Sequence, residues 1–354
     1  MDFMRSGAPQ VCVTRSDNSL GNRENMPYVT VLMSVYNAGD YLVQAIQSIL
    51  EQSFRNFEFL IINDASTDRS REIILSFNDP RIVLVDNANN IGLTRSLNKG
   101  LKLARGRYIA RMDADDIAMP ERLKKQVDFL DAHPDYGLVG TYFQLYPSGK
   151  IMRVPVQDEE IRTFMLFSNT FAHPSVMFRK ELVDRYQLYY NEELLAAQDE
   201  ELWYRMSKYG KIYNLPEVLL QYRVHPDQIS SSRHQLQQSI SMQIKWQKIK
   251  DFLDHQPIPD EPFYEKWMSD SAVSFSSSEF ELLKKWILLI YRHNLRTQKL
   301  PVKQLRVCLV NLIIKFLSRW DNKEPLIYLK LLYLFIQIRR VPVRFLLKEF
   351  RIFG

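Results

Sequence analysis

Short apolar runs alternate with segments of helical periodicity over the first third of the chain, and this alternation restricts the fold more than any other feature. The runs have the length of buried strands. Between them, apolar residues recur every three or four positions, as on one face of a helix. Strands that alternate with helices predict a doubly wound, mainly parallel sheet. The predicted strands are 29–35, 57–62, 81–85 and 108–112, and the predicted helices are 42–50, 71–77 and 93–104.

Polar clusters stand at the ends of three of these predicted strands. They are residues 34–37, residues 63–64 and residues 113–116, and the last contains Asp113, Asp115 and Asp116. In open sheets of this class, ligands bind outside the carboxyl ends of the strands. Clustered carboxylates suit a hard divalent cation, Mg²⁺ or Mn²⁺, which itself holds substrate phosphates. The first two clusters are then placed to hold a nucleoside, although a solvated acidic loop is an alternative for the third.

The chain after residue 136 has a less regular pattern. Strand-like runs cover 138–145, 176–178 and 218–224, and a helix begins near Asp199, for which an N-cap is the ordinary structural role. From about 233 onward the sequence is helical and basic. We therefore expect a loose extension at 1–26, a catalytic domain at 27–232 and a basic helical region at 233–354.

Charge is distributed unevenly along the 354 residues. The net charge is +6, yet the segment from residue 300 onward has 11 Lys and Arg against 3 Asp and Glu. Cys12 and Cys308 show neither metal-ligand spacing nor a disulfide framework, which fits a reducing compartment. No stretch reaches the roughly 18–20 apolar residues that span a bilayer. We expect a cytoplasmic protein.

The basic C-terminal region contains two predicted amphipathic helices. In the first, at 304–318, polar residues fall on one face, and a second follows Pro325. Cationic amphipathic helices favour a peripheral location on the inner face of the membrane. The alternatives are packing of these helices on the catalytic sheet and a homodimer interface. No motif accompanies the charge that would indicate nucleic acid.

The chain resembles the family-2 glycosyltransferases, which have the A-type nucleotide-sugar fold. The resemblance covers about residues 28–232 and depends on six segments in order. They are Val-Leu-Met-Ser-Val-Tyr-Asn, Ile-Ile-Asn-Asp-Ala-Ser-Thr-Asp, Asn-Ile-Gly-Leu-Thr-Arg-Ser-Leu-Asn-Lys-Gly, Gly-Arg-Tyr-Ile-Ala-Arg-Met-Asp-Ala-Asp-Asp, Gln-Asp-Glu-Glu-Leu-Trp and Tyr-Arg-Val-His-Pro-Asp-Gln-Ile-Ser. Each segment alone is weak, and six in order are specific.

The resemblance implies roles for the nucleotide-sugar site. Tyr36 and Asp64 match positions that embrace the nucleobase and ribose, with Asn37 in the same cluster, and Arg95 matches a basic position near the nucleotide. Packing, a turn cap and a solvated helix face are the alternatives for Tyr36, Asp64 and Arg95.

The acidic motif and the later segments receive roles from the same resemblance. Asp113 matches a ribose-binding position and Asp115 the metal ligand, while Asp116 matches a group that either orients the sugar or supports the residues that bind it. His225 resembles a late metal or phosphate ligand, with a structural role as the alternative, and Asp199 matches the base of an inverting transfer.

Two positions depart from the family pattern. Gln198 stands where Glu is usual, and Ala65 stands where Gly is common. We expect Gln198 to alter acceptor binding or the pKa of Asp199. Because glycine adopts positive φ at the lowest cost, Ala65 predicts a turn that avoids strongly positive φ.

The sequence therefore predicts a metal-dependent inverting glycosyltransferase. Its expected donor is a nucleotide sugar, UDP-linked, and its acceptor a glycan or lipid-linked glycan of a cell-surface polysaccharide. A sugar nucleotidyltransferase would have a Gly-rich phosphate loop after the first strand, and a dinucleotide oxidoreductase a Gly-x-Gly-x-x-Gly motif; neither is present. A degenerate, membrane-docked binding partner of another transferase is the alternative, supported by Gln198.

Overall fold

The computed structural model describes residues 26–225, 228, 234–256, 266 and 277–318. The chain divides into two compact units. Unit 1 comprises Met1–Asp158 and Thr170–Gln237, and unit 2 comprises Glu159–Asn169 and Gln238–Gly354.

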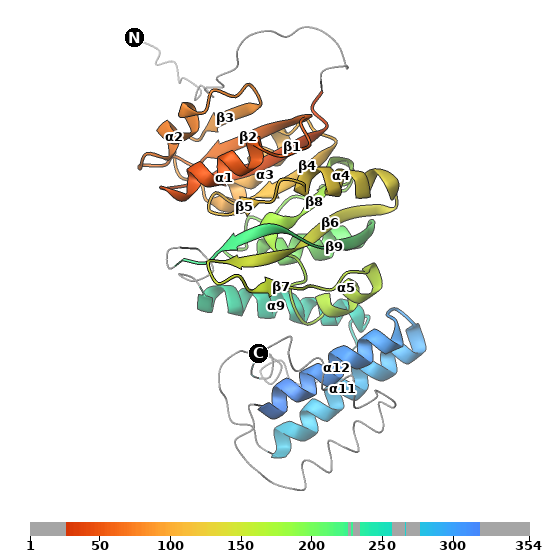
Figure 1. Ribbon diagram of the computed structural model, residues 1–354. Coiled ribbons are helices and arrows are strands. Elements are labelled where there is room, and N and C mark those ends of the chain that lie inside the picture. The colour runs from red at the N-terminus through yellow and green to blue at the C-terminus, as the bar shows by residue number, and fades with distance from the viewer. Residues whose placement is uncertain (1–25, 226–227, 229–233, 257–265, 267–276, 319–354) are drawn as a thin grey trace, which may run out of the picture. The chain divides into compact units, whose positions relative to one another are not determined.

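Unit 1 is built on one sheet of nine strands among its described residues (Figure 1). The strand order is β3-β2-β1-β4-β8-β6-β9-β5, and β7 pairs with β6. Strands β1 to β4 pair in parallel, whereas β8 runs antiparallel to both β4 and β6. The expected mainly parallel, doubly wound sheet is confirmed, with antiparallel pairs in its second half. The strands are β1 Val29–Val35, β2 Phe57–Asn63, β3 Ile82–Asp86, β4 Tyr108–Met112, β5 Ile117–Ala118, β6 Tyr136–Tyr146, β7 Ile151–Met152, β8 Met177–Arg179 and β9 Lys211–Arg223.

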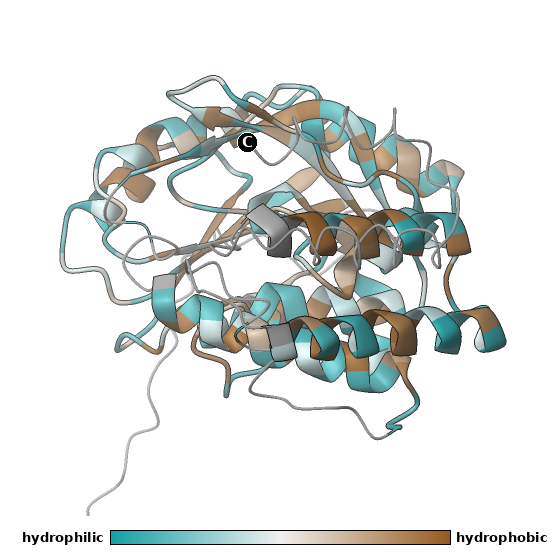
Figure 2. Ribbon diagram, turned by 90° about the horizontal axis from the view of Figure 1, so that it is seen from below, coloured by the Kyte–Doolittle hydropathy of each residue, from teal (hydrophilic) through white to brown (hydrophobic). Residues whose placement is uncertain are grey.

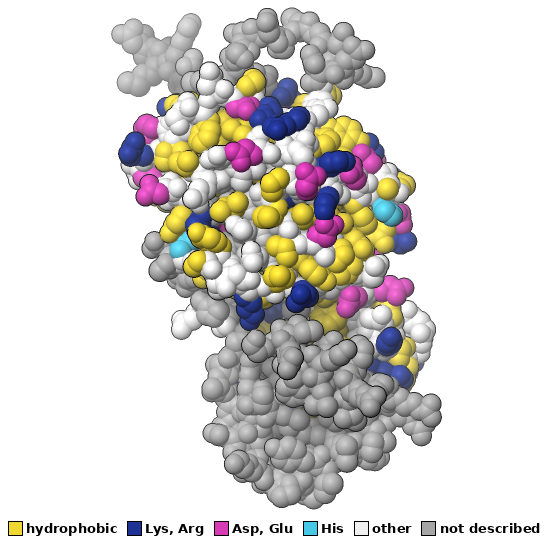
Figure 3. Space-filling view, viewed as in Figure 1, with side chains coloured by type: hydrophobic (Ala, Val, Ile, Leu, Met, Phe, Trp, Pro, Cys, Tyr) yellow, Lys and Arg dark blue, Asp and Glu magenta, His cyan; other side chains and the backbone are white. Residues whose placement is uncertain are grey.

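Helices cover both faces of the sheet in unit 1, because its central strands carry apolar side chains on each face and these must be shielded from water. One apolar cluster joins alternate residues of β1, such as Val31, to Ile46 of α1 and Leu123 of α4. On the opposite face α3 packs close to β1, where Gly100 leaves room for Leu32. The helices are α1 Tyr41–Leu50, α2 Ser70–Ser76, α3 Leu93–Leu103, α4 Arg122–Ala132, α6 Lys180–Tyr186 and α7 Gln198–Ser207, with a 3₁₀ turn, η2, at His173–Ser175. On the face shown in Figure 3, basic and acidic side chains are interspersed.

Unit 2 is helical. Its elements are α5 Asp158–Met165, α9 His234–Phe252, α11 Ser277–Thr297 and α12 Val302–Ser318, of which α5 and α9 begin within unit 1. Its core joins Trp246 of α9 and Trp286 of α11 to Leu309 of α12. Asn294 closes the turn between α11 and α12, since its amide accepts from the Leu300 N–H at 2.9 Å and donates to the Leu300 carbonyl at 2.8 Å.

The helix expected at 304–318 is present as α12, but its apolar side is buried. Leu305, Leu309 and Ile313 have no exposed surface and belong to the core of unit 2. The second predicted helix, after Pro325, lies outside the described residues. Among the residues that are described, no helix combines the length and hydrophobicity needed to cross a membrane. Hydrophobic and hydrophilic residues are mixed along the helices in Figure 2.

Candidate active site

The three predicted carboxylates lie directly after β4, in a segment that we call the acidic turn (residues 113–116). All five residues of β4 are buried, so the chain leaves the core abruptly at Met112. The side chains of Asp113 and Asp115 are 27% and 29% exposed, whereas Asp116 is 1% exposed. The acidic turn therefore presents two carboxylates to solvent and holds the third inside the protein.

Two buried arginines lie beneath the acidic turn. Arg111 forms an ion pair with Asp113, and Arg122 donates to the Arg111 carbonyl at 2.6 Å. Arg122 is fully buried, and this burial lowers the pKa of its guanidinium to about 9, although the charge of Asp116 opposes the shift. Burial of the Arg122 guanidinium is unfavourable, and the negative charges of Asp116 and Asp113 offset part of this penalty. The chain itself thus offsets part of the negative charge that sequence reasoning attributed to a bound metal.

The end of β9 meets the acidic turn from the other side. The side chain of Arg223 donates to the Asp115 carbonyl at 2.8 Å and to Gln44 at 2.6 Å, and its backbone N–H donates to Asp116 at 2.8 Å. His225 Nε2 lies 3.0 Å from the Asp115 carboxylate. The structure therefore brings together two residues, Asp115 and His225, that are 110 positions apart.

Asp116 leaves one oxygen without a partner. Its Oδ1 accepts from Arg223, but no described residue donates to its buried Oδ2. Burial raises the pKa of Asp116 well above its usual value, and the charges of Asp113 and Asp115 add to the rise. Burial also raises the pKa of Asp113, although the ion pair with Arg111 opposes this.

These oxygens and the imidazole of His225 suit a divalent cation that also binds substrate. No group of three or more protein ligands able to hold a metal occurs among the described residues. Mg²⁺ is commonly bound by one or two carboxylates together with substrate phosphates, so the set formed by Asp115 and His225 fits this kind of site. The orphaned Oδ2 of Asp116 is a further acceptor for a ligand at the same place.

The loops after β1 and β2 are tied to one another. The Asn37 carboxamide accepts from the Thr67 N–H at 2.8 Å, and the Asn37 N–H donates to Ser66 at 3.1 Å. Tyr36 beside it is 51% exposed, which leaves its ring available to a ligand. Asn37 thus shapes the loop with its side chain.

Asp64, at the end of β2, is 2% exposed and accepts three hydrogen bonds. The donors are Asn87 Nδ2 at 2.7 Å and the N–H groups of Ile91 and Gly92 at 2.9 and 2.8 Å. The turn-capping role considered for this residue is therefore present in the structure. Arg95, on α3, is 61% exposed and pairs with Glu192 at 3.3 Å.

Asp199 lies in the first turn of α7 and is partly buried. Ala197 occupies the N-cap position, so the alternative interpretation of Asp199 as the N-cap is wrong. Burial raises the pKa of the Tyr190 phenol; the charge of Arg111 opposes the rise, and the charges of Asp199 and Asp113 add to it. The Tyr190 hydroxyl lies 2.8 Å from His173 Nε2.

The two departures from the family pattern have structural consequences. Ala65 has φ of 57°, in the left-handed region, so the expectation that this turn avoids strongly positive φ is wrong. Hydrogen bonds on either side of Ala65, from Asp64 N–H to Val35 and from Ser66 N–H to Asn63, hold the turn in this conformation. Gln198 is 7% exposed and forms the first residue of α7, after the left-handed Ala197.

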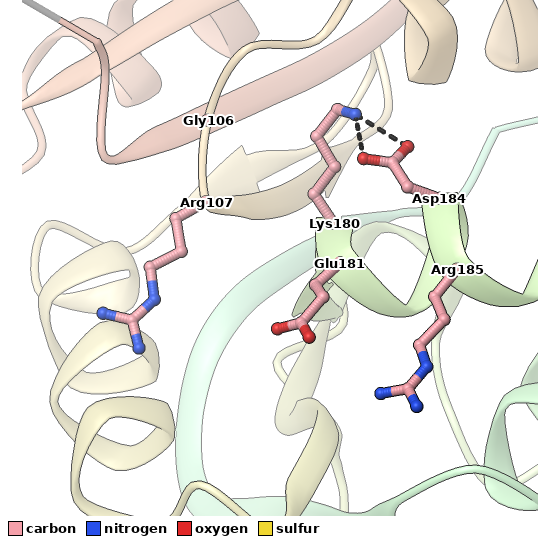
Figure 4. A pocket seen from close by; sticks show the side chains of 6 residues that line it. All are labelled: Gly106, Arg107, Lys180, Glu181, Asp184 and Arg185. Carbon is pink, nitrogen blue, oxygen red and sulfur yellow. Dashed lines mark hydrogen bonds and ion pairs between the residues drawn. The ribbon is translucent and has the colours of Figure 1, made fainter. Parts of the chain in front are cut away.

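A pocket of about 560 Å³ lies at the opposite end of β4 from the acidic turn. It is lined by residues that precede β4 and by one side of α6, including Arg107, Lys180 and Arg185 (Figure 4). Lys180 and Asp184 face each other there and form an ion pair at 2.6 Å. The spacing between Arg107 and Asp113 along an extended strand is about 20 Å, so this pocket is separate from the candidate site.

Sequence reasoning missed the arginines that organise the site. Arg111 interrupts an apolar strand, and a charge at such a position is the signal that could have identified it. Arg223 stands two residues before His225 in a quoted segment, but its contacts with the acidic turn depend on the pairing of β9 with β6 and β5. Tyr190 gave no local signal.

The acidic turn lies at the carboxyl end of a parallel strand, where sheets of this class bind ligands, and comparisons with known proteins identify the family. The model of "Glycosyl transferase family 2" matches residues 30–186. An uncharacterized glycosyltransferase of Haemophilus influenzae is 34% identical over 245 residues, covering 65% of this chain and 76% of that protein. The amylovoran biosynthesis glycosyltransferase AmsE of Erwinia amylovora is 31% identical over 212 residues, covering 58% and 79%.

The fold also matches a solved structure. S. aureus TarS 1–349 in complex with UDP-GlcNAc has a TM-score of 0.57 at 17% identity, covering 82% of this chain and 89% of that one. The A-type glycosyltransferase fold expected from the sequence is confirmed. The chain belongs to glycosyl transferase family 2, and it is a glycosyltransferase.

Proposed function

We propose that this enzyme is a metal-dependent, inverting glycosyltransferase that uses a UDP-linked sugar to extend a surface polysaccharide. The observation that carries the proposal is the convergence of Asp115, Asp116 and His225 at the end of β4, fixed by Arg223. The name of AmsE connects a relative to the biosynthesis of a polysaccharide, and TarS binds UDP-GlcNAc.

The donor would bind along the edge formed by the ends of β1, β2 and β4. Tyr36 is exposed and would contact the nucleobase, and Asp64 would accept from a uracil-type N–H with its remaining lone pair on Oδ2. Asn37 would contribute to the nucleotide site between Tyr36 and Asp64. Arg95 would add positive charge near the nucleotide, where its only described partner is the half-exposed Glu192.

Each carboxylate of the acidic turn would bind a different part of the donor. Asp113 would accept from the ribose, and Asp116 would orient the sugar through its unpartnered oxygen. Asp115 and His225 would hold Mn²⁺ or Mg²⁺, which when bound stabilises negative charge on the departing nucleotide diphosphate.

Asp199 would act as the general base. As the acceptor oxygen forms its bond to C1, the bond from C1 to the phosphate oxygen breaks on the opposite face, and its electron pair leaves with the diphosphate. The proton of the acceptor hydroxyl passes to the Asp199 carboxylate. A positioned base of this kind typically contributes about 10² to 10⁴-fold in rate.

The acceptor would be a glycan or a lipid-linked glycan, and the enzyme would work on the inner face of the membrane. The excess of basic residues from residue 300 onward, 11 Lys and Arg against 3 Asp and Glu, supports this location. The apolar side of α12 is buried in unit 2, so it does not supply the membrane contact.

Thermal unfolding with UDP, GDP and dTDP and their sugars, each with and without Mn²⁺ or Mg²⁺, tests the donor site. A ligand at about 100 times its dissociation constant adds about 2.7 kcal/mol to the folded state. We expect metal-dependent stabilisation by the uridine nucleotides. Stabilisation by another nucleotide class would correct the donor, and no response from folded protein would reject the donor site.

The alternative expected from the sequence, a degenerate binding partner of another transferase, is supported only by Gln198, and the chain belongs to a glycosyltransferase family. Sugar transfer by the wild type that falls in Asp199→Asn would support Asp199 as the base. Transfer that is equal in the two proteins would instead reject Asp199 as the base.

A further inference from the structure

Helix α11 has one buried side and one cationic side. Its buried side chains, among them Leu283, Trp286 and Ile290, belong to the core of unit 2. The other side carries a row that we call the cationic stripe: Lys285, Leu288, Leu289, Arg292 and Arg296. The three cations are exposed, and the two leucines are partly buried because they also pack against the core of unit 2. The stripe lines a hollow of about 400 Å³, together with Gln256 and His293.

The cations of the stripe have no acidic partner among the described residues. By contrast, the neighbouring Lys284 pairs with Glu281 at 3.4 Å, and Lys299 pairs with Asp254 at 2.5 Å. The segment 277–318 has 8 Lys and Arg against 2 Asp and Glu. The two acids of this segment, Glu279 and Glu281, already pair with Lys266 and Lys284. The positive charge of the stripe is therefore available to a partner outside the described chain.

The spacing of these cations indicates the kind of partner. Along the helix axis, Lys285 and Arg292 are separated by about 10 Å, and Arg292 and Arg296 by about 6 Å. One small anion would need donors that converge on a point, whereas this row suits several phosphates that lie side by side. The leucines between the cations add apolar contact, as in helices that lie in a membrane interface.

We propose that the cationic stripe of α11 docks unit 2 on a bilayer that contains anionic phospholipids. The cations contact lipid phosphates while Leu288 and Leu289 face the boundary of the acyl chains. This inference builds on the proposed membrane location and moves the contact from α12 to α11. Its readout requires no sugar transfer, so a failure to bind vesicles and a failure to transfer sugar are separate results.

Flotation of the full chain with vesicles tests the proposal. We expect binding to phosphatidylcholine vesicles that contain phosphatidylglycerol, little binding to phosphatidylcholine alone, and weaker binding at high salt. The triple variant Lys285→Gln, Arg292→Gln, Arg296→Gln should reduce partitioning by about 100-fold, as expected for three cations at an anionic surface.

Two control variants separate charge from folding and from specific recognition. The first control removes the same three positive charges from exposed residues of unit 1. This variant, Lys124→Gln, Arg153→Gln, Arg185→Gln, should bind vesicles like the wild type. Arg292→Lys, Arg296→Lys keeps the charge and should also bind. Thermal unfolding of each variant confirms that it is folded.

Three results would overturn the proposal. They are equal partitioning of the wild type and the triple Gln variant, absence of wild-type binding to anionic vesicles, and loss of binding in the unit 1 control. An RNA oligonucleotide serves as the competing ligand. Wild-type protein that binds this RNA but not the vesicles would assign the stripe to nucleic acid.

Discussion

Arg223 should position the acidic turn, and the change Arg223→Lys tests this while it preserves the charge. The guanidinium reaches Asp115 and Gln44 at the same time and lies over the rings of Tyr41 and Tyr146, with its central carbon 4.8 and 4.9 Å from the ring centroids. An ammonium group cannot reproduce this forked geometry.

The expected loss of stability follows from the contacts that a lysine side chain cannot make at this position. If one hydrogen bond from a charged donor is lost, the free energy of unfolding falls by about 1.5–3 kcal/mol. The larger effect is expected on function, because groups that orient a metal ligand typically contribute about 10–100-fold in metal affinity or activity. We therefore expect kcat/KM for sugar transfer, and Mn²⁺ affinity in the presence of UDP, to fall by about 10–100-fold.

Arg179→Lys is the matched control for this prediction. Arg179 also forms several side-chain hydrogen bonds, to Tyr136, Tyr108 and Leu130, but it lies beside the first residue of β4, at the opposite end of that strand from the acidic turn. Its replacement should lower stability by a similar amount and leave metal affinity unchanged. Equal kinetic effects of the two substitutions, or no kinetic effect of Arg223→Lys at all, would refute the positioning role.

Four further outcomes are expected. Asp199→Asn should lower the rate of transfer by about 10² to 10⁴-fold and leave UDP affinity unchanged in calorimetry. Mn²⁺ should raise UDP affinity, and UDP should raise Mn²⁺ affinity by the same factor. Leu309→Ala, in a position without exposed surface, should reduce the stability of unit 2 to urea by about 2–5 kcal/mol. Burial, and then the hydrogen bond to Asp131, raises the pKa of Tyr108 from 10.0 to about 12, so stability present below pH 10 should be lost as pH rises toward 12. In Tyr108→Phe, the fall in the free energy of unfolding between pH 10 and pH 12, measured with urea, should be smaller than in the wild type by about 2–3 kcal/mol.

The first half of the sheet could be predicted from the sequence because its signals are local. Each of the strands from β1 to β4 is a short apolar run followed by a helical pattern, whereas their order in the sheet, β3-β2-β1-β4, has no local signal. The strand expected at 218–224 extends from Lys211 to Arg223; its first half lacks an apolar run, and one of the residues buried there is the polar Asn214. Only the family resemblance placed His225 beside the acidic motif.

The fate of the C-terminal apolar stripes could not be predicted in the same way. A helix with one apolar side looks alike in sequence whether that side meets a bilayer or another helix. In α12 the residues Leu305, Leu309 and Ile313 meet α11 and its neighbours, so the tail builds a core of its own. The exposed cations of the cationic stripe lie on α11, a helix that sequence analysis did not single out.

The buried arginines change the account of what a metal does at this site. The acidic turn brings three carboxylates together, but Arg111, Arg122 and Arg223 surround them with three guanidinium groups. The protein alone therefore carries little net charge there, and a divalent cation gains little from the carboxylates in the absence of substrate. A nucleotide diphosphate brings negative charge that no described residue of the acidic turn balances. Metal and donor should then bind tightly only together, since the charge that the cation compensates belongs to the donor.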